Sequence, residues 1–326
     1  DLTRTLKVDL AVNNSATIDE PEGSLSKDAP DYKAKRDTLW RNFWDFGRPT
    51  MYRQTTNINY QVPINKIPFL DFLSLNTRYS ANYDWTGAAK SLQYLGNNIQ
   101  NSNTKQYNGQ INLNTLYNKV PYFRKVNQSP NRAGRNQRQR NNQQAEQLEE
   151  DENRYEFFKY MTRFMLSVKN VSINYSENRG TFLPGFMPKP HFLGQEWSMM
   201  APGLPFVFGS QNDIRYKAAS EGWLTPNPSL NTLYKTNFSS NLTLRSTLEP
   251  FRQFRIELTA NKSRSLNSQE YWRADSLGSF QSFSPIETGG FSVSIISWST
   301  AFLKDDEQYS SKTFAQFRNY RNEIAK

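Results

Sequence analysis

The sequence contains no cysteine, a single histidine and no long apolar run. The absence of cysteine excludes disulfides, thiol nucleophiles and thiolate-bound metals. A membrane-spanning helix needs about 18 consecutive apolar residues, so the sequence predicts none. The chain also begins without methionine and enters a strand-like stretch at once. We therefore expect it to be part of a longer protein.

Motifs for catalysis and ligand binding are also lacking. The single histidine, His191, lies between two other ring-bearing residues, and no nucleophile elbow accompanies it. Residues 47–50 read GRPT, which does not meet the phosphate-loop pattern. Clustered carboxylates occur only in a charged block and at Asp305–Glu307, where solvation or helix capping explains them. We expect no enzyme, no catalytic or metal site and no cofactor.

What the sequence does contain is many aromatic residues set among small polar ones. Hydrophobic residues make up only 36%, yet aromatic residues reach 14%. Disordered chains are poor in aromatic residues, so we expect a folded protein. A sheet with one apolar face and one wet face needs this mixture.

The charge is uneven. The formal net charge is +10, and part of it lies in the stretch 131–140, which the acidic stretch 146–152 follows. Basic stretches of this kind can bind nucleic acid. However, no aromatic residues alternate with these arginines to stack on bases, and blocks of like charge usually form solvated loops. We interpret 118–154 as a low-complexity charged loop and expect no nucleic-acid partner.

Alternation of apolar and polar residues is the dominant pattern. It is unbroken over the thirteen residues 73–85. About eight strands are predicted, most of them longer than the five or six residues usual in soluble sheets. The last predicted strand shifts phase at 295–296, which indicates a bulge. The other stretches with this pattern are 6–13, 57–64, 107–117, 171–176, 234–245, 253–261 and 291–302.

The predicted connections differ in length. Two are short, near 65–70 and 249–251, whereas 14–50, 86–106, 118–154, 177–231 and 263–289 are long. If each connection reverses an antiparallel strand, the two short turns share one end of the sheet. The connections 14–50, 86–106 and 177–231 then share the other end, and 118–154 is a long exception at the short-turn end. Short turns at one end and long loops at the other are typical of outer-membrane barrels.

Two architectures fit the alternation. In a soluble sandwich the apolar face points into a core, whereas in an outer-membrane barrel it meets lipid and the polar face lines the lumen. Strand length, polar faces rich in Asn and Ser, and aromatic residues near strand ends favour the barrel. We predict an all-β, antiparallel transmembrane β-barrel segment with long loops and a short helix within 305–326. The lumen-facing candidates are Arg78, Asp84, Asn112, Asn114, Lys235, Arg245, Arg255 and Glu257.

One segment, FLPGFMPKPHFLGQEWSMMAPGLPFVFGSQ at 182–211, is as apolar as a core but rich in proline and glycine. That proline density excludes a helix or a central strand. A freely exposed apolar loop is an aggregation hazard. We therefore predict that 177–231 is a structured loop, folded against the lumen wall or forming a lid for a partner. The candidate packing or docking side chains are Phe182, Phe186, Phe192, Trp197, Phe206 and Phe208.

Four stretches closely resemble the SprA/Sov family, the outer-membrane translocons of the type IX secretion system in Bacteroidota. They are LWRNFWDFGRPTMYRQ at 39–54, LGNNIQNSNTKQYNGQINLNTLYNKVPYF at 95–123, SVKNVSINYSENRGTFLPGF at 167–186 and APGLPFVFGSQ at 201–211. The resemblance runs from about residue 39 to the C-terminus, and the block 131–144 carries none of it.

The resemblance implies that 1–326 is one arc of a very large barrel in the outer membrane of a Gram-negative bacterium. The implied function is the passage of folded cargo proteins that carry C-terminal signal domains, including gliding-motility adhesins in gliding species. The implied partners are this cargo, a PorV-like shuttle β-barrel at a lateral opening, a periplasmic plug protein and outer-membrane lipid. About eight strands cannot close such a pore alone.

A lumen lined with Asn, Ser, Thr and Gln offers hydrogen bonds without strong apolar or ionic adhesion, so folded cargo could pass without sticking. The charged candidates either steer cargo or only solvate the wall. Two other functions stay open. One is a different large outer-membrane transporter barrel, whose plug or partner signature is not seen in this sequence. The other is a surface β-rich adhesin domain.

Overall fold

The computed structural model describes residues 5–20, 27, 30–44, 47–127, 161–162, 164, 166–251, 254–294 and 311–324. The chain divides into two units, Asp1–Ser292 and Val293–Lys326. The first unit contains a β-sheet, and the second contains helix α7 (Lys312–Ile324).

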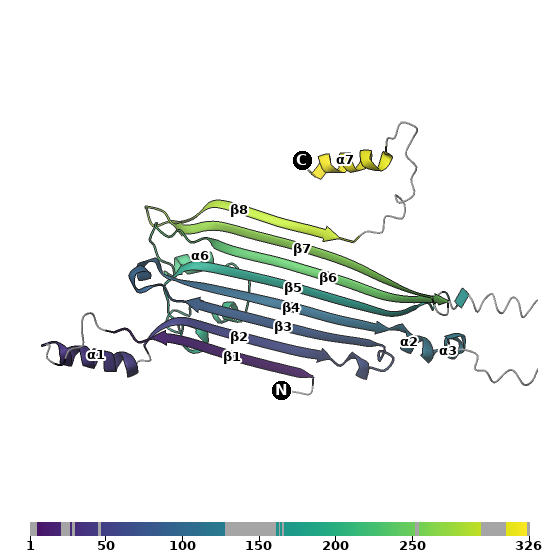
Figure 1. Cartoon of the computed structure of the whole chain (residues 1–326), viewed down its shortest axis with the longest axis horizontal. Helices are drawn as coiled ribbons and strands as arrows, with labels where there is room; N and C mark the ends of the chain where they lie inside the picture. Colours follow the sequence, from purple (N-terminus) through teal and green to yellow (C-terminus); the bar gives the residue numbers. More distant parts are fainter. Residues whose placement is uncertain are drawn as a thin grey trace, which may run out of the picture. The chain divides into compact units, whose positions relative to one another are not determined.

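Eight strands of the described residues form one sheet, in which neighbours in space are neighbours in sequence (Figure 1). The paired strands from β1 to β7 are all antiparallel. The predicted all-β antiparallel fold with a short C-terminal helix is thus confirmed. The sheet is open, with β1 and β8 as its edges, so its closure into a barrel stays a prediction. The strands are β1 (Leu6–Thr17), β2 (Arg48–Val62), β3 (Leu73–Thr86), β4 (Asn97–Asn112), β5 (Val168–Phe186), β6 (Tyr234–Phe251), β7 (Phe254–Ala274) and β8 (Phe280–Val293).

Strand β3 follows the prediction, because every residue from 73 to 85 alternates. Strand β4 corrects two predictions. The stretch 86–106 is not a long loop: only a short connection with the 3-10 helix η2 (Lys90–Leu95) separates β3 from β4. The predicted strand 107–117 ends at Asn112, where helix α2 (Leu113–Lys119) begins. The Asn112 side-chain oxygen accepts a hydrogen bond from the backbone N–H of Thr115 at 3.3 Å, so this residue caps the helix.

Other boundaries differ from the predictions as well. Strand β5 continues to Phe186, so the loop predicted at 177–231 begins only at residue 187. The predicted loop 263–289 is a hairpin of β7 and β8, whose turn is held by Asp275. The Asp275 carboxylate accepts hydrogen bonds from the backbone N–H groups of Leu277 and Ser279. Strand β6 continues through the turn predicted at 249–251, and Phe251 pairs with Phe254 of β7.

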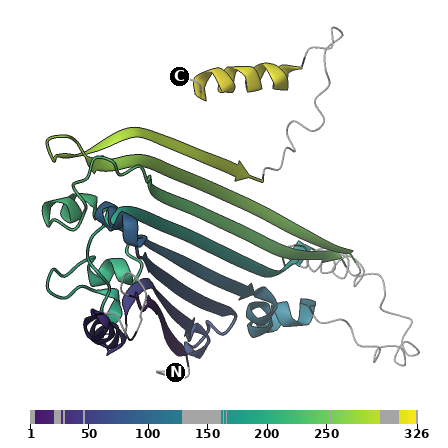
Figure 2. The ribbon, with the colours of Figure 1, turned by 60° about the vertical axis from the view of Figure 1, so that its left-hand side comes forward.

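The connections lie at two ends of the sheet. One end, here the turn end, holds the β2–β3 turn with the 3-10 helix η1 (Ile64–Lys66) and the β6–β7 turn. The helices α2 and α3 (Pro121–Asn127) begin the long β4–β5 connection there. The loop end holds helix α1 (Tyr32–Trp44), η2, the tight β7–β8 turn and residues 187–233. Figure 2 shows the helices between β5 and β6 gathered at the end opposite α2 and α3.

Some predictions fall outside the described residues. They are the charged block within 118–154 beyond residue 127, the bulge at 295–296, and the acidic start of the C-terminal helix at 305–307. Within α7, the rings of Phe314 and Phe317 stack with centroids 6.2 Å apart. In the described ranges, no helix has both the length and the hydropathy needed to cross a membrane.

Candidate functional site

One face of the sheet is polar across six consecutive strands. Cross-strand partners lie on the same face, so the register defines rows of side chains. A row through the middle of this polar face joins Asn59, Arg78, Gln106, Ser176, Asn241 and Ser263 from β2 to β7. The next row toward the loop end joins Asn57, Ser80, Thr104, Asn178, Ser239 and Ser265.

Side chains of the polar face bind one another across the strands. The Ser80 hydroxyl donates to the Asn57 side-chain oxygen at 2.7 Å, and the Thr55 hydroxyl donates to the Asn82 oxygen at 2.9 Å. These contacts fix the orientation of the amides. The face is therefore an ordered surface of hydrogen-bonding groups that contains few apolar side chains.

Six of the eight predicted lumen-facing residues lie on the polar face. Asp84 pairs with Arg53 at 2.5 Å, and Arg255 pairs with Glu257 at 3.0 Å. The remaining three, Arg78, Lys235 and Arg245, stand apart on β3 and β6. The charges are thus dispersed and do not form one cluster.

The other two predicted lumen-facing residues lie at the end of this surface or outside it. Asn112 pairs with Asn170 at the edge of the polar face and serves as the cap of α2. Asn114 lies within α2 and does not belong to the sheet, so the strand position predicted for it is wrong. The alternation of 107–117 gave no sign that the chain changes to a helix at residue 113.

The opposite face, here the apolar face, exposes large hydrophobic side chains toward the turn end. One of its rows joins Val62, Leu75, Gly109, Ile173, Leu244 and Ala260. Leu244 is 38% exposed and Leu258 is 46% exposed. Within the described part of the Asp1–Ser292 unit, no second layer covers this half of the face. In a soluble sandwich these residues would face a second sheet.

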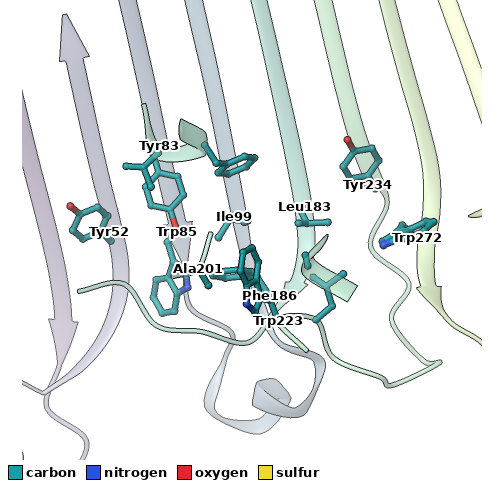
Figure 3. Packing of buried hydrophobic residues seen from close by; sticks show 14 residues of the cluster. Tyr52, Tyr83, Trp85, Ile99, Leu183, Phe186, Ala201, Trp223, Tyr234 and Trp272 are labelled. Carbon is teal, nitrogen blue, oxygen red and sulfur yellow. The ribbon is translucent and has the colours of Figure 1, made fainter. Parts of the chain in front are cut away.

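The loop-end half of the apolar face is covered by residues 187–233, here the covering segment. It contains the 3-10 helix η4 (Phe192–Gly194) and the short helices α5 (Leu204–Val207) and α6 (Arg215–Ser220). Figure 3 shows the rings of Tyr83, Trp85 and Trp223 between the strands and this segment. The side chains buried at 2% exposure or less include Tyr83, Trp85, Ile99, Leu183, Phe186, Phe206, Val207 and Trp223.

Because most of the covering segment has no regular structure, its carbonyl groups need donors from elsewhere. Strands β3 and β4 supply them. The Asn101 amide donates to the carbonyl oxygens of Phe206 at 2.9 Å and Ser210 at 2.7 Å. The Tyr79 hydroxyl donates to the carbonyl oxygen of Phe208 at 2.6 Å. Two further donors are the Asn103 amide to Gly209 at 2.5 Å and the Trp85 indole to Pro188 at 3.0 Å.

Two glycines allow the segment to approach the sheet closely. Gly194 has φ of +66°, and a Cβ there would lie 2.7 Å from the Tyr83 ring. Gly209 has φ of +89°, and a Cβ there would lie 2.8 Å from the Cβ of Ala81. Both the backbone conformation and the space require glycine at these positions.

Helix α6 is held to β6 and β7 by Arg215. Its guanidinium lies 4.4 Å from the centre of the Tyr234 ring and 5.0 Å from that of Trp272. The guanidinium also pairs with Asp213 at 2.8 Å and with Glu270. Partial burial tends to raise the pKa of Asp213, but the hydrogen bonds and charge of Arg215 outweigh it, so this pKa is lowered. Cation–π and ionic contacts thus meet at one side chain.

The residues predicted to pack or dock differ in their burial and in the face on which they lie. Phe186 and Phe206 are buried against the sheet, and Phe208 is half-buried. Phe182 belongs to β5 and lies on the polar face, where it pairs with Lys235. Phe192 is 74% exposed and Trp197 is 45% exposed, with the Trp197 indole bound to the Phe192 carbonyl at 3.2 Å.

The covering segment packs against the sheet on its apolar face, opposite the predicted lumen-facing residues, so the predicted polar lumen wall and the segment predicted to fold against it do not share one face. The physical reason is that its buried aromatic side chains match the apolar face. Its carbonyls find donors there in Asn101 and Asn103 of β4 and in Tyr79 and Trp85 of β3. Asn101, Asn103 and Arg215 are not among the residues predicted from the sequence; the loss of alternation in β4 is a signal for the two asparagines, and Arg215 has no comparable local signal.

His191 directly precedes η4 in the covering segment. Its ring nitrogen lies 2.9 Å from the Glu196 carboxylate within the covering segment. Among the described residues, no group of three or more His, Asp or Glu side chains could hold a metal ion. No protein-family model matches the sequence, and no curated protein matches it.

Proposed function

We propose that this chain is one arc of the wall of a very large outer-membrane β-barrel that conducts folded proteins in type IX secretion. One observation carries the proposal. The same sheet has a polar face that is continuous from β2 to β7 and, behind it, an apolar face exposed at the turn end. The polar face would line the lumen, and the exposed apolar half would meet lipid.

The exposed apolar side chains support a lipid environment. Burying one leucine or valine side chain is worth about 1.5–3 kcal/mol. Leu10, Val12, Leu244 and Leu258 each leave a large fraction exposed, as do Phe291 and Val293 of β8. A sheet that faced water on both sides would forgo this energy along its whole width. Contact with lipid acyl chains removes the cost.

The strand edges and the polar face together support a large pore. An open sheet edge is not tolerated in lipid, because its N–H and C=O groups have no water to bind. Closing these eight strands on themselves would leave an interior just wide enough for side chains to fill. The long charged side chains Arg78, Lys235 and Arg245 need water around them instead. Further strands of the full protein would therefore continue the sheet beyond β1 and β8.

The chemistry of the polar face suits cargo that must slide without sticking. Neutral amides and hydroxyls exchange hydrogen bonds between water and cargo at little net cost, because net hydrogen-bond energies are only about 0.5–1.5 kcal/mol. The resemblance of four stretches to the SprA/Sov family supplies the type IX assignment. It also supplies the proposed partners: cargo with C-terminal signal domains, a PorV-like shuttle, a periplasmic plug and outer-membrane lipid.

Photo-crosslinking from adjacent residues of β6 tests this function. Asn241 lies on the polar face and Leu242 lies on the apolar face. A photo-reactive amino acid is placed at either position in the full-length protein, in cells that secrete cargo. We expect crosslinks to cargo from position 241 and not from position 242. Equal crosslinking from both positions would contradict the proposal, as would recovery of the protein in a soluble fraction.

A further inference from the structure

A row of cations marks the border between the covered and exposed halves of the apolar face. The register joins Lys105, Glu177, Ser240 and Arg264 in one row. The next row toward the turn end joins Tyr107, Tyr175, Leu242 and Lys262. Arg179 follows Glu177 on β5, one row closer to the covering segment. Four cations thus stand beside one carboxylate.

The charges on this border do not balance. Glu177 pairs with Arg179 at 2.9 Å and lies 4.0 Å from Lys105, so its carboxylate is already engaged. Arg264 and Lys262 contact aromatic rings: Arg264 lies 5.9 Å from Phe238 and Lys262 lies 5.8 Å from Phe291. In the described part of the chain, no carboxylate forms an ion pair with Arg264 or Lys262. This includes the carboxylate of Glu287 on the neighbouring strand.

A cavity opens at the same place. Its volume is about 480 Å³, which is within the range of small-ligand pockets. Arg179 and Arg264 line it on either side of Phe238, with their guanidinium carbons 5.1 Å and 5.9 Å from the ring centre. The acidic residues at its other end, Asp213 and Glu270, are paired with Arg215. Arg179 is bonded to Glu177 as well, so Arg264 is the guanidinium group of this lining that forms no ion pair with a described carboxylate and can receive an anion.

The residues below the cavity are those of a lipid-facing surface. The rings of Tyr107 and Tyr175 lie 6.1 Å apart just below the cation row, and amphipathic rings of this kind gather at membrane interfaces. From Arg264 down to Phe254, strand β7 has eleven residues, and a tilted strand needs about 9–11 to span a membrane. The cation row would therefore lie at the level of the lipid headgroups.

We infer that Arg264 and Lys262, together with Arg179, form a binding site for the phosphate-bearing headgroup of a membrane lipid. The inference rests on the proposed function in one respect, because it needs the apolar face to meet lipid. The phosphate binds at the mouth of the cavity, where a guanidinium group can donate two parallel hydrogen bonds to two of its oxygens. The acyl chains lie over Leu242, Leu244 and Leu258. The site thereby fixes the height of this sheet in the membrane.

Lipid titration of the detergent-solubilised full-length protein tests the site. The probes are a fluorescent diphosphoryl lipid A, its dephosphorylated form with the same acyl chains, and inorganic phosphate as competitor. Replacing two cations with the double variant Arg264→Gln/Lys262→Gln removes charge-assisted hydrogen bonds. We expect the affinity for the diphosphoryl lipid to fall about tenfold or more. The dephosphorylated lipid should bind the unaltered protein about as weakly as the diphosphoryl lipid binds the double variant.

Two control variants keep the result interpretable. The charge-preserving variant Arg264→Lys/Lys262→Arg should retain most of the affinity. The variant Arg245→Gln/Lys235→Gln removes two cations from the polar face and should bind the lipid as the unaltered protein does. Equal affinity of the Arg264→Gln/Lys262→Gln variant, or equal binding of the dephosphorylated lipid, would overturn the inference. Full displacement by millimolar inorganic phosphate would overturn it too, and would assign the cavity to free phosphate.

A separate measurement distinguishes this inference from the proposed function. Single cysteines at Leu244 and Arg245, neighbours on opposite faces, are labelled with a fluorophore in the reconstituted protein. One outcome is that brominated lipid quenches the label at position 244 and not at 245 while the titration shows no preference for phosphate. That pair of results would reject the headgroup site and leave the proposed function standing. Equal exposure of both positions to water rejects the lipid-facing sheet, and the proposed function with it.

Discussion

The side-chain amide of Asn101 in β4 donates hydrogen bonds to the carbonyl oxygens of Phe206 and Ser210, which lie 105 and 109 residues further along the chain. Asn101 is fully buried among aromatic and aliphatic side chains. A buried amide is costly unless it is hydrogen-bonded, and here the covering segment provides the partners. The polar residues of β4 and the irregular backbone of the segment therefore depend on each other.

Replacing Asn101 with alanine should loosen the covering segment. The change removes the Asn101 donor from both carbonyl groups, of which that of Phe206 keeps the backbone N–H of Gly209, at a cost of about 1–3 kcal/mol. Trypsin cleavage of the full-length protein at Arg215 and Lys217 should speed up by roughly tenfold or more, because 1.4 kcal/mol is a factor of ten. The control Asn108→Ala lies on the same strand but faces away from the segment. Unchanged cleavage in Asn101→Ala would show that these hydrogen bonds do not hold the segment.

The sequence predicts most of the sheet because apolar and polar residues alternate along the strands. Prediction fails where a strand must also supply polar side chains to bind the covering segment. Strand β3 has apolar side chains on one face and polar ones on the other, so alternation alone identifies it. Strand β4 carries Asn101 and Asn103 on the apolar face, because they bind the segment above. That use breaks the alternation, and the first half of β4 therefore looks like a loop.

The covering segment also shows a limit of prediction from sequence. Its apolar composition correctly indicates packing, but alternation cannot tell which face of a sheet it covers. The contacts that decide this join residues about a hundred positions apart. Strand β5 runs on through Pro184 and Gly185, which normally argue against a strand. The Arg215 contacts are equally long-range, and no local pattern announces them.

Gly209→Ala should dislodge the covering segment, because the added Cβ would lie 2.7 Å from the Tyr79 hydroxyl and 2.8 Å from Ala81. Gly222→Ala is the matched control. It also has a positive φ, of +71°, but a Cβ there meets nothing within 4 Å. Both variants bear the backbone cost of about 1 kcal/mol, and only the first adds a steric clash. Hydrogen exchange should show faster opening around residue 209 in the first variant; equal exchange in both would argue against close packing.

Arg215→Met should destabilise the junction of α6 with β6 and β7. It leaves Glu270, which is 9% exposed, as a buried carboxylate without its cation. Breaking such a pair costs about 3–5 kcal/mol. The double variant Arg215→Met/Glu270→Gln removes both charges and should recover much of this loss, as measured by hydrogen exchange in α6. If the double variant is as unstable as the single one, the ion pair is not the source of the stability.

Acid should loosen α6 through Asp213. The pKa of this carboxyl in the folded protein is lowered from its ordinary value of 3.8. Its contribution to stability is therefore complete above pH 3.8 and is lost as the pH falls through the lower, folded-state pKa. A spin label at Ser220→Cys, at the end of α6, should become more mobile over that interval. In Asp213→Asn the label should show no step there, and an identical step in both proteins would assign the transition to other groups.

Reversing Arg78, Arg245 and Arg255 to glutamate together tests whether the polar face steers cargo. The three arginines lie on β3, β6 and β7 of that face, and the reversal changes its charge by six units without altering the apolar face. Fields from charged walls change encounter rates by about 10-fold to 1,000-fold, so secretion of acidic cargo should fall and that of basic cargo should not. The neutral variant with glutamine at all three positions should give an intermediate result. Unchanged secretion of every cargo by the glutamate variant would show that these arginines only solvate the wall. Cargo that is not steered by charge is secreted equally well whichever sign the wall carries.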